Sequence, residues 1–196
     1  MIWRRPGLWR FALLGVAFGI LIRAGDSASG VVAWVVNIGG PWILLSFLIG
    51  AASMDVGAAV LGSVVALEAA VVAKYATQLG EGAISVHAAA LRVIAWGLAA
   101  LGVSLVFAFA GSRSRQRGLY FLLPAAAFSA EAVAFLAGGL RGESAHLRYV
   151  GQPAAVAVFG CELAAAGVLV ALTVMSRSSG VRPRRPDGVA RATEGA

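Results

Sequence analysis

The sequence predicts an all-α fold, a polytopic transmembrane bundle of six helices. Of its 196 residues, 60% are hydrophobic and only 13% are charged, whereas about 25% are charged in an ordinary soluble domain. The apolar residues fall into runs of the length that crosses a bilayer, and six spans of about 20 residues use about 120 residues. This composition excludes a soluble globular protein, because too little polar surface remains to cover a core of this size.

The first two apolar runs differ from the four that follow. Residues 8–22 follow Arg4 and Arg5, contain Arg10 near their start and resemble a signal peptide, but five more spans follow, so we expect an uncleaved first helix. Residues 30–52 are interrupted by Gly39-Gly40-Pro41. Because proline removes a backbone donor and glycine loosens the turn before it, this second span is predicted to be kinked or broken there.

The remaining four spans are uninterrupted. They are expected at residues 57–79, 88–110, 119–139 and 150–175. Residues 1–175 then form a single transmembrane domain. Residues 176–196 are rich in Ser, Gly, Pro and Arg and lack apolar periodicity, which predicts a disordered basic cytoplasmic tail.

The basic residues predict the orientation. With six spans, eleven of the 16 basic residues fall on the side of both termini and five on the other side. The positive-inside rule therefore places both termini in the cytoplasm. The preference for Arg over Lys, with much Ala, Gly and Val, is typical of a GC-rich bacterial genome and favours a bacterial plasma membrane.

The same rule decides which partners are expected. The net charge of +7 has a topological explanation, so no nucleic-acid partner is expected. The expected partners are the lipid bilayer, anionic lipid at the C-terminal tail, and either further copies of the chain or transporter partner subunits.

Three acidic residues lie inside the predicted spans, and they are the candidate site for a proton, cation or solute. Glu68, Glu131 and Glu162 lie about 11 to 13 residues from the cytoplasmic ends of their spans, near the midplane. A charge there costs about 2.5 to 3.5 kcal/mol. The three either share a proton or cation, or each is protonated and serves helix association. Tyr75, on the face of Glu68, is expected to donate a hydrogen bond into the same cavity.

A second candidate site is an outer pocket beside the helix break. Trp34, Trp42 and Trp96 are placed around it, with Asn37 next to the break. A broken helix exposes backbone donors and carbonyls, which is tolerated at membrane depth where it lines a cavity. The alternative is an interfacial belt of aromatic residues.

Small residues recur at four-residue spacing, which predicts close helix packing. They include Gly15 and Gly19 on the first span and the ridge 58–70 on the third. No metal site, cofactor or enzymatic activity is expected, because the two histidines lie in outer loops, the one cysteine is isolated, and no nucleophile or phosphate-loop motif occurs.

Two resemblances bear on function. Residues 37–51, with Ala130-Glu131-Ala132, resemble a family of small actinobacterial membrane proteins known only as a domain of unknown function, which implies a multi-pass membrane protein. The layout is also similar to the substrate-binding components of energy-coupling-factor vitamin transporters. In those, small residues on the first span contact the coupling subunit and an outer-half pocket binds the vitamin. Gly15 and Gly19 stand where alanines are expected.

These observations leave three functional hypotheses. The first is a small-solute or ion permease, or a transport accessory, with a midplane carboxylate site. The second is the substrate-binding membrane component of an energy-coupling-factor type transporter. The third is a structural or assembly membrane protein without transport activity.

Overall fold

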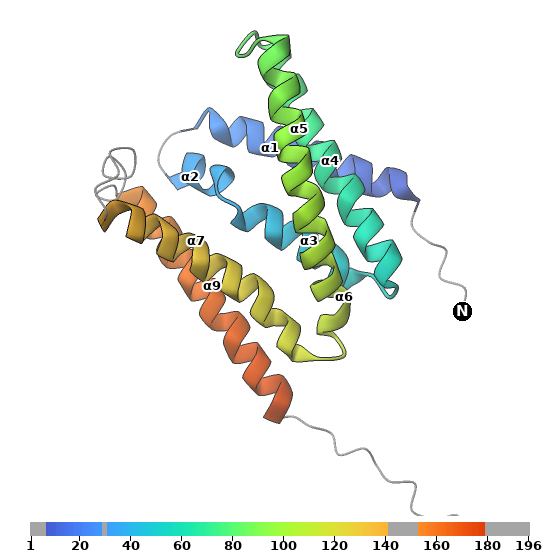
Figure 1. Cartoon of the computed structure of the whole chain (residues 1–196), viewed down its shortest axis with the longest axis vertical. Helices are drawn as coiled ribbons and strands as arrows, with labels where there is room; N and C mark the ends of the chain where they lie inside the picture. The colour runs from blue at the N-terminus through green and yellow to red at the C-terminus, as the bar shows by residue number, and fades with distance from the viewer. Residues whose placement is uncertain (1–6, 29–30, 141–152, 179–196) are drawn as a thin grey trace, which may run out of the picture.

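The computed structural model describes residues 7–28, 31–140 and 153–178, and over these residues the fold is all-helical (Figure 1). The elements are α1 (Leu8–Asp26), α2 (Val31–Asn37), α3 (Gly40–Ala52), α4 (Val56–Gly80), α5 (Val86–Val103), the π-helical turn η1 (Ser104–Ala108), α6 (Phe109–Ser114), the 3-10 helix η2 (Gly118–Phe121), α7 (Leu122–Leu140) and α9 (Pro153–Ser178). The predicted tail, residues 176–196, lies outside the described part beyond Ser178.

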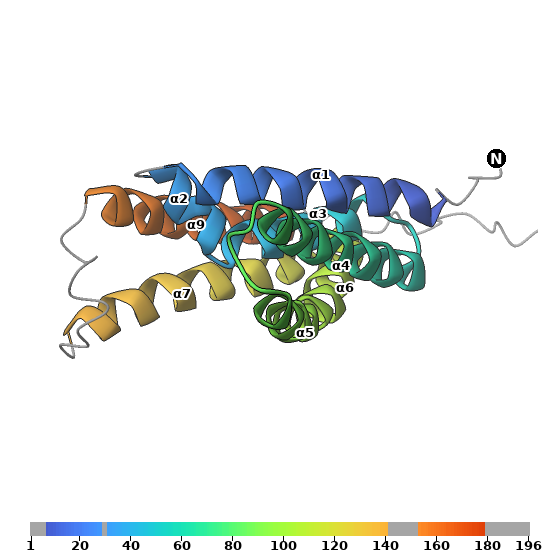
Figure 2. The ribbon, with the colours of Figure 1, turned by 90° about the horizontal axis from the view of Figure 1, so that it is seen from above.

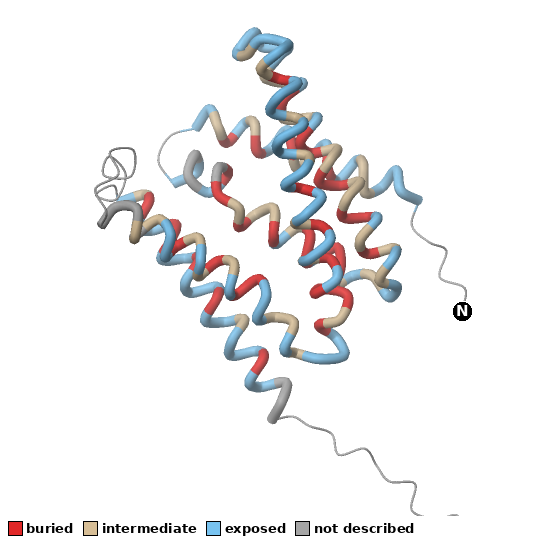
Figure 3. The backbone as a smooth tube through the Cα atoms, viewed as in Figure 1, coloured by how far each residue is buried: buried red, intermediate tan, exposed pale blue. Residues whose placement is uncertain are grey.

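Five helical stretches are long and apolar enough to cross a membrane. They are Leu8–Asp26, Val56–Gly80, Val86–Ser114, Gly118–Phe135 and Pro153–Met175, and they match five of the six predicted spans. Large apolar side chains cover their outer faces: Leu21, Leu98 and Val168 are 65%, 68% and 59% exposed. Buried positions lie on the sides of the helices that face one another (Figure 3). Such an apolar exterior fits a lipid environment, and the all-α prediction is confirmed.

The second predicted span is broken at the expected place. Helix α2 ends at Asn37 and α3 begins at Gly40, with Pro41 in its first turn, where the missing N–H costs no intrahelical bond. The backbone N–H groups of Trp42 and Ile43 both donate to the carbonyl of Gly39. With 13 residues, α3 is about 20 Å long. It is therefore too short to cross a bilayer without α2.

The predicted ridges of small residues on the first and third spans pack against each other. Gly15 lies against Ala66 and Gly19 against Ala70, and a Cβ on either glycine would overlap the backbone of α4. The residue numbers of the contacting pairs increase together along α1 and α4, so the two helices run in the same direction. The glycines allow the two backbones to approach closely.

The direction of each helix follows from the contacts at its ends. Because α1 and α4 run in the same direction, α2 and α3 together return the chain between them. Arg115 donates to the sulfur of Met54 at the α3–α4 connection, and Thr173 of α9 donates to the carbonyl of Gly118. The start of α1 and the end of α9 therefore lie at the same end of the bundle (Figure 2).

Helix α3 occupies the middle of the molecule, between α4 and α5 on one side and the paired helices α7 and α9 on the other (Figure 1). Ile43 packs into a cluster with Phe128 of α7 and Ala166 of α9. Trp42 packs against a cluster that contains Leu67 of α4. The break before α3 is thereby placed in the interior, where it meets side chains from both sides.

Candidate functional site

Two of the three glutamates inside the helices meet at the break between α2 and α3. The backbone N–H of Gly39 donates to Oε1 of Glu131 at 2.8 Å. A Cβ on Gly40 would lie 2.6 Å from Oε1 of Glu162, and one on Gly39 would lie 3.2 Å from Oε2 of Glu131. The carboxyl group of Glu162 also lies close enough to that of Glu131 for the two to interact. The two glycines thus leave the space that both carboxyl groups occupy.

The two carboxyl groups have different surroundings. Glu131 accepts a backbone hydrogen bond at the N-terminal end of α3, where the helix dipole favours negative charge. Glu162 is only 7% exposed, and neither of its oxygens accepts a hydrogen bond from an N–H or hydroxyl group among the described residues. An ionised carboxylate buried in this way is costly, and two such groups side by side share their protons. The surroundings therefore favour a negative charge on Glu131 over one on Glu162.

Apolar layers enclose the pair on both sides along the helices. Glu131 is preceded on its face by Phe128 and followed by Phe135, and Glu162 is preceded by Phe159, as their spacing predicts. The rings of Phe135 and Phe159 stack with centroids 4.1 Å apart and planes at 21°. Two buried clusters form these layers: Ile38, Ala132, Val158 and Phe159, and Ile43, Ala125, Phe128 and Ala166. The carboxyl groups are therefore shielded in a low-dielectric interior.

Glu68 does not join this site. It is the central residue of α4 and points to α5, where a Cβ on Gly97 would lie 2.9 Å from its Oε2. Within the described part of the chain its carboxyl group makes no hydrogen bond or ion pair. It lies on the face of α4 that packs on α5, whereas α7 and α9 lie beyond α3.

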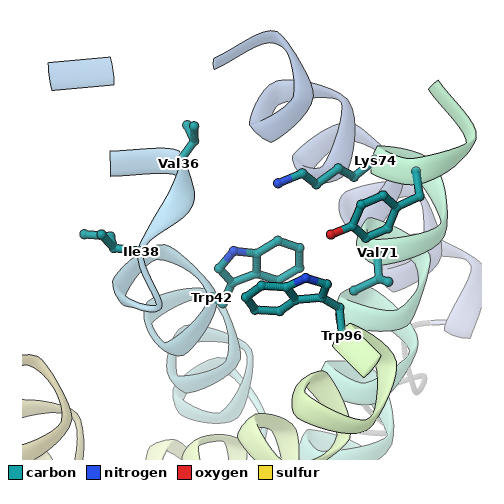
Figure 4. Close-up of a pocket in the computed structure, with 7 residues that line it drawn as sticks. Val36, Ile38, Trp42, Val71, Lys74 and Trp96 are labelled. Carbon is teal, nitrogen blue, oxygen red and sulfur yellow. The ribbon is translucent and has the colours of Figure 1, made fainter. Parts of the chain in front are cut away.

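The candidate outer pocket is a small cavity between α2, α3, α4 and α5 (Figure 4). Its volume is about 30 Å³, and it is lined by Val36, Ile38, Trp42, Val71, Lys74, Tyr75 and Trp96. Tyr75, predicted beside Glu68, lies here with Trp42 and Trp96 instead. The side chains of Trp34 and Asn37 lie outside the described part. A space of this size holds about one water molecule.

A charged cluster lies next to this cavity. Lys74 pairs with Asp26 at 3.1 Å, and both side chains are 12% exposed. Arg23 of α1 forms an ion pair with Glu81, the residue that follows α4. These pairs join the C-terminal ends of α1 and α4, and they use the ammonium group of Lys74 that would otherwise face the cavity.

Three buried serines form a polar contact that the sequence analysis missed. The hydroxyl of Ser63 on α4 lies 2.9 Å from that of Ser46 on α3 and 3.0 Å from that of Ser104 in η1. Ser46 donates to the carbonyl of Val103 at 3.3 Å. All three serines are fully buried. The contact connects three helices at the π-helical turn, a feature often found at functional positions. The only signal in the sequence is a serine inside each of three apolar runs.

Comparisons of the chain with protein-family models, with curated proteins and with solved structures gave no match. The family resemblance based on residues 37–51 stays a prediction. The function proposed below is therefore carried by the geometry of the chain itself.

Proposed function

We propose that this is a multi-pass protein of the bacterial plasma membrane with both termini in the cytoplasm, acting as a small-solute or ion permease or as a transport accessory. Glu131 and Glu162 form its proton site. One observation carries the proposal: carboxyl groups from two long apolar helices meet at the break of a third helix.

A proton suits this pair better than a metal ion does. Hard cations such as Ca²⁺ and Mg²⁺ need about six oxygen ligands. Over the described residues, no group of three or more His, Cys, Asp or Glu side chains gathers in one place. One oxygen of Glu131 already accepts an N–H, and the positive end of α3 repels a cation.

The different surroundings assign a role to each carboxyl group. Glu131 is the member that holds negative charge, because Gly39 and the end of α3 stabilise it. Glu162 is the member that carries the proton, because its oxygens have no donor among the described residues. Broken helices at mid-membrane are common at ion and solute sites of transporters. A change in the angle between α2 and α3 that moves Gly39 away from Glu131 would destabilise the carboxylate and favour proton uptake, and the return of Gly39 would favour proton release.

The other two hypotheses have less support. Gly15 and Gly19, the residues that would contact a coupling subunit, are covered by α4. The aromatic cavity of about 30 Å³ is too small for a vitamin. A purely structural role would not require the carboxyl groups of two helices to lie side by side at the break of a third helix.

Proton flux into vesicles tests the proposal. The full chain is reconstituted with a trapped pH-sensitive dye, a pH gradient is imposed, and the proton itself is the probe. Glu131→Gln and Glu162→Gln are compared with Glu68→Gln, the same substitution at a half-buried position that lies away from the pair. We expect flux to fall at least about tenfold in the first two variants and to stay near the wild-type rate in the third.

Two results would overturn the proposal. One is a wild-type chain that moves no protons under the gradient. The other is an equal loss of flux in all three variants, which would show a general effect of removing a carboxyl group from a long apolar helix. Either result leaves a packing role for the glutamates.

A further inference from the structure

A second cavity lies at the connection between α6 and η2, far along the bundle from the aromatic one. Its volume is about 230 Å³, and it is lined by Phe109, Arg113, Gln116, Arg117 and Tyr120. It lies at the end of the bundle where Arg115 contacts Met54 and Thr173 contacts Gly118. Under the proposed topology, this is the cytoplasmic end.

The side chains of this cavity hold one another in place. Nη1 of Arg113 donates to Oε1 of Gln116 at 3.3 Å. The guanidinium of Arg113 also lies over the ring of Phe109, 5.8 Å from its centroid. The rings of Phe109 and Tyr120 meet edge to face with centroids 5.8 Å apart. Arg113 is therefore oriented before any ligand arrives, which lowers the entropic cost of binding.

Both arginines of the cavity come from the turn that ends α6. The backbone N–H of Arg117 donates to the carbonyl of Arg113, and Arg117 itself is extended, so the chain reverses here and both side chains line the same cavity. Among the described residues, the ion pairs are those of Arg23 with Glu81 and Lys74 with Asp26, so no carboxylate neutralises either arginine of the cavity. Arg115, between them in the sequence, points to Met54 instead.

The donors in this cavity match the acceptors of a phosphate. Two guanidinium groups offer planar pairs of N–H donors, the geometry that binds phosphate oxygens two at a time. The phenol of Tyr120 and the amide NH₂ of Gln116 add neutral donors. The flanking helical segments carry exposed apolar side chains, among them Leu105, Leu122 and Leu123.

We propose that this cavity binds a phosphoryl group, which is supplied by the headgroup of an anionic phospholipid or by free phosphate. The basic run around Arg113 and Arg117 then has a ligand as well as a topological role. This binding is independent of the carboxyl pair.

The test measures binding to the full chain in uncharged detergent micelles. Phosphatidylglycerol is titrated and bound lipid is counted by native mass spectrometry, with phosphatidylcholine as the neutral comparison. Inorganic phosphate forms the second arm, both alone and as a competitor. Arg113→Gln and Arg117→Gln remove cavity donors. Arg115→Gln is the matched control, with the same loss of charge from the same connection but a side chain directed to Met54.

We expect each cavity variant to bind about fivefold more weakly and the double variant about 25-fold more weakly, while Arg115→Gln stays within twofold of the wild type. If phosphatidylglycerol binds and added phosphate does not displace it, the site is a lipid site. Tight binding of phosphate alone assigns it to the free anion. Arg117→Lys, which keeps the charge but loses the paired donors, covers the case that Arg117→Gln does not fold.

The proposal is overturned if phosphatidylglycerol binds no better than phosphatidylcholine and phosphate does not bind. It is also overturned if Arg115→Gln weakens binding as much as the cavity variants, because the effect would then come from net charge alone.

Discussion

Replacing Gly40 with alanine tests whether the break between α2 and α3 is shaped around Glu162. The new Cβ would lie 2.6 Å from Oε1 of Glu162, and ordinary contact begins at 3.4 Å, so the carboxyl group must move by about 0.8 Å. Glu162 is only 7% exposed, so the carboxyl group has little free space into which it can move. We expect Gly40→Ala to cost about 1 kcal/mol, the lower end of the range for overpacking, because the displaced atom is the end of a side chain. We also expect it to separate the carboxyl pair.

Chemical denaturation in micelles and proton flux in vesicles measure the two effects. Gly160→Ala is the matched control: it lies on α9 near Glu162 with no neighbouring atom within 4 Å of the added Cβ, so it should be neutral or stabilising by about 0.5 to 1 kcal/mol. Glu162→Asp shortens the side chain by about one bond, 1.5 Å, and should restore stability in Gly40→Ala. The reasoning is refuted if Gly40→Ala behaves like Gly160→Ala in both assays, or if Glu162→Asp rescues nothing.

Two further substitutions test the helix packing, both measured as the free energy of unfolding. Gly15→Ala would place a Cβ in the backbone of Ala66, which cannot move aside as a side chain can. It should therefore lower the free energy of unfolding by about 3 kcal/mol. A loss under about 1 kcal/mol would contradict the close approach of α1 and α4. Ser63→Ala would leave the buried hydroxyls of Ser46 and Ser104 without their shared partner and should cost about 1 to 3 kcal/mol. An unchanged stability would mean that the three serines do not depend on one another.

The sequence predicted those features that local chemistry determines. The break at Gly39-Gly40-Pro41 follows from the missing donor of proline, which acts in any apolar span. The close approach of α1 and α4 follows from the four-residue spacing of small residues such as Gly15 and Ala66. The long apolar runs predicted the five long helices, because length and hydropathy depend on sequence alone.

The sequence did not predict which acidic side chains meet. Residue counts give the depth of a side chain along a helix, but its neighbours depend on how the helices are turned and arranged. Glu131 and Glu162 meet because α7 and α9 lie together on one side of α3. Glu68 has a similar predicted depth but faces Gly97 on the other side. Tyr75 shares a cluster with Leu67 and Val71, so its helix face leads to the aromatic cavity.

The infrared band of a protonated carboxyl group tests the central claim most directly. The account predicts a C=O stretching band from Glu162 in the wild-type protein near neutral pH, absent in Glu162→Gln and retained in Glu68→Gln. In Glu131→Gln that band should be lost at lower pH than in the wild type, because the variant removes the neighbouring negative charge that disfavours ionisation of Glu162. A band that is unchanged in Glu162→Gln, or that disappears only in Glu68→Gln, would contradict the assignment of the shared proton to Glu131 and Glu162.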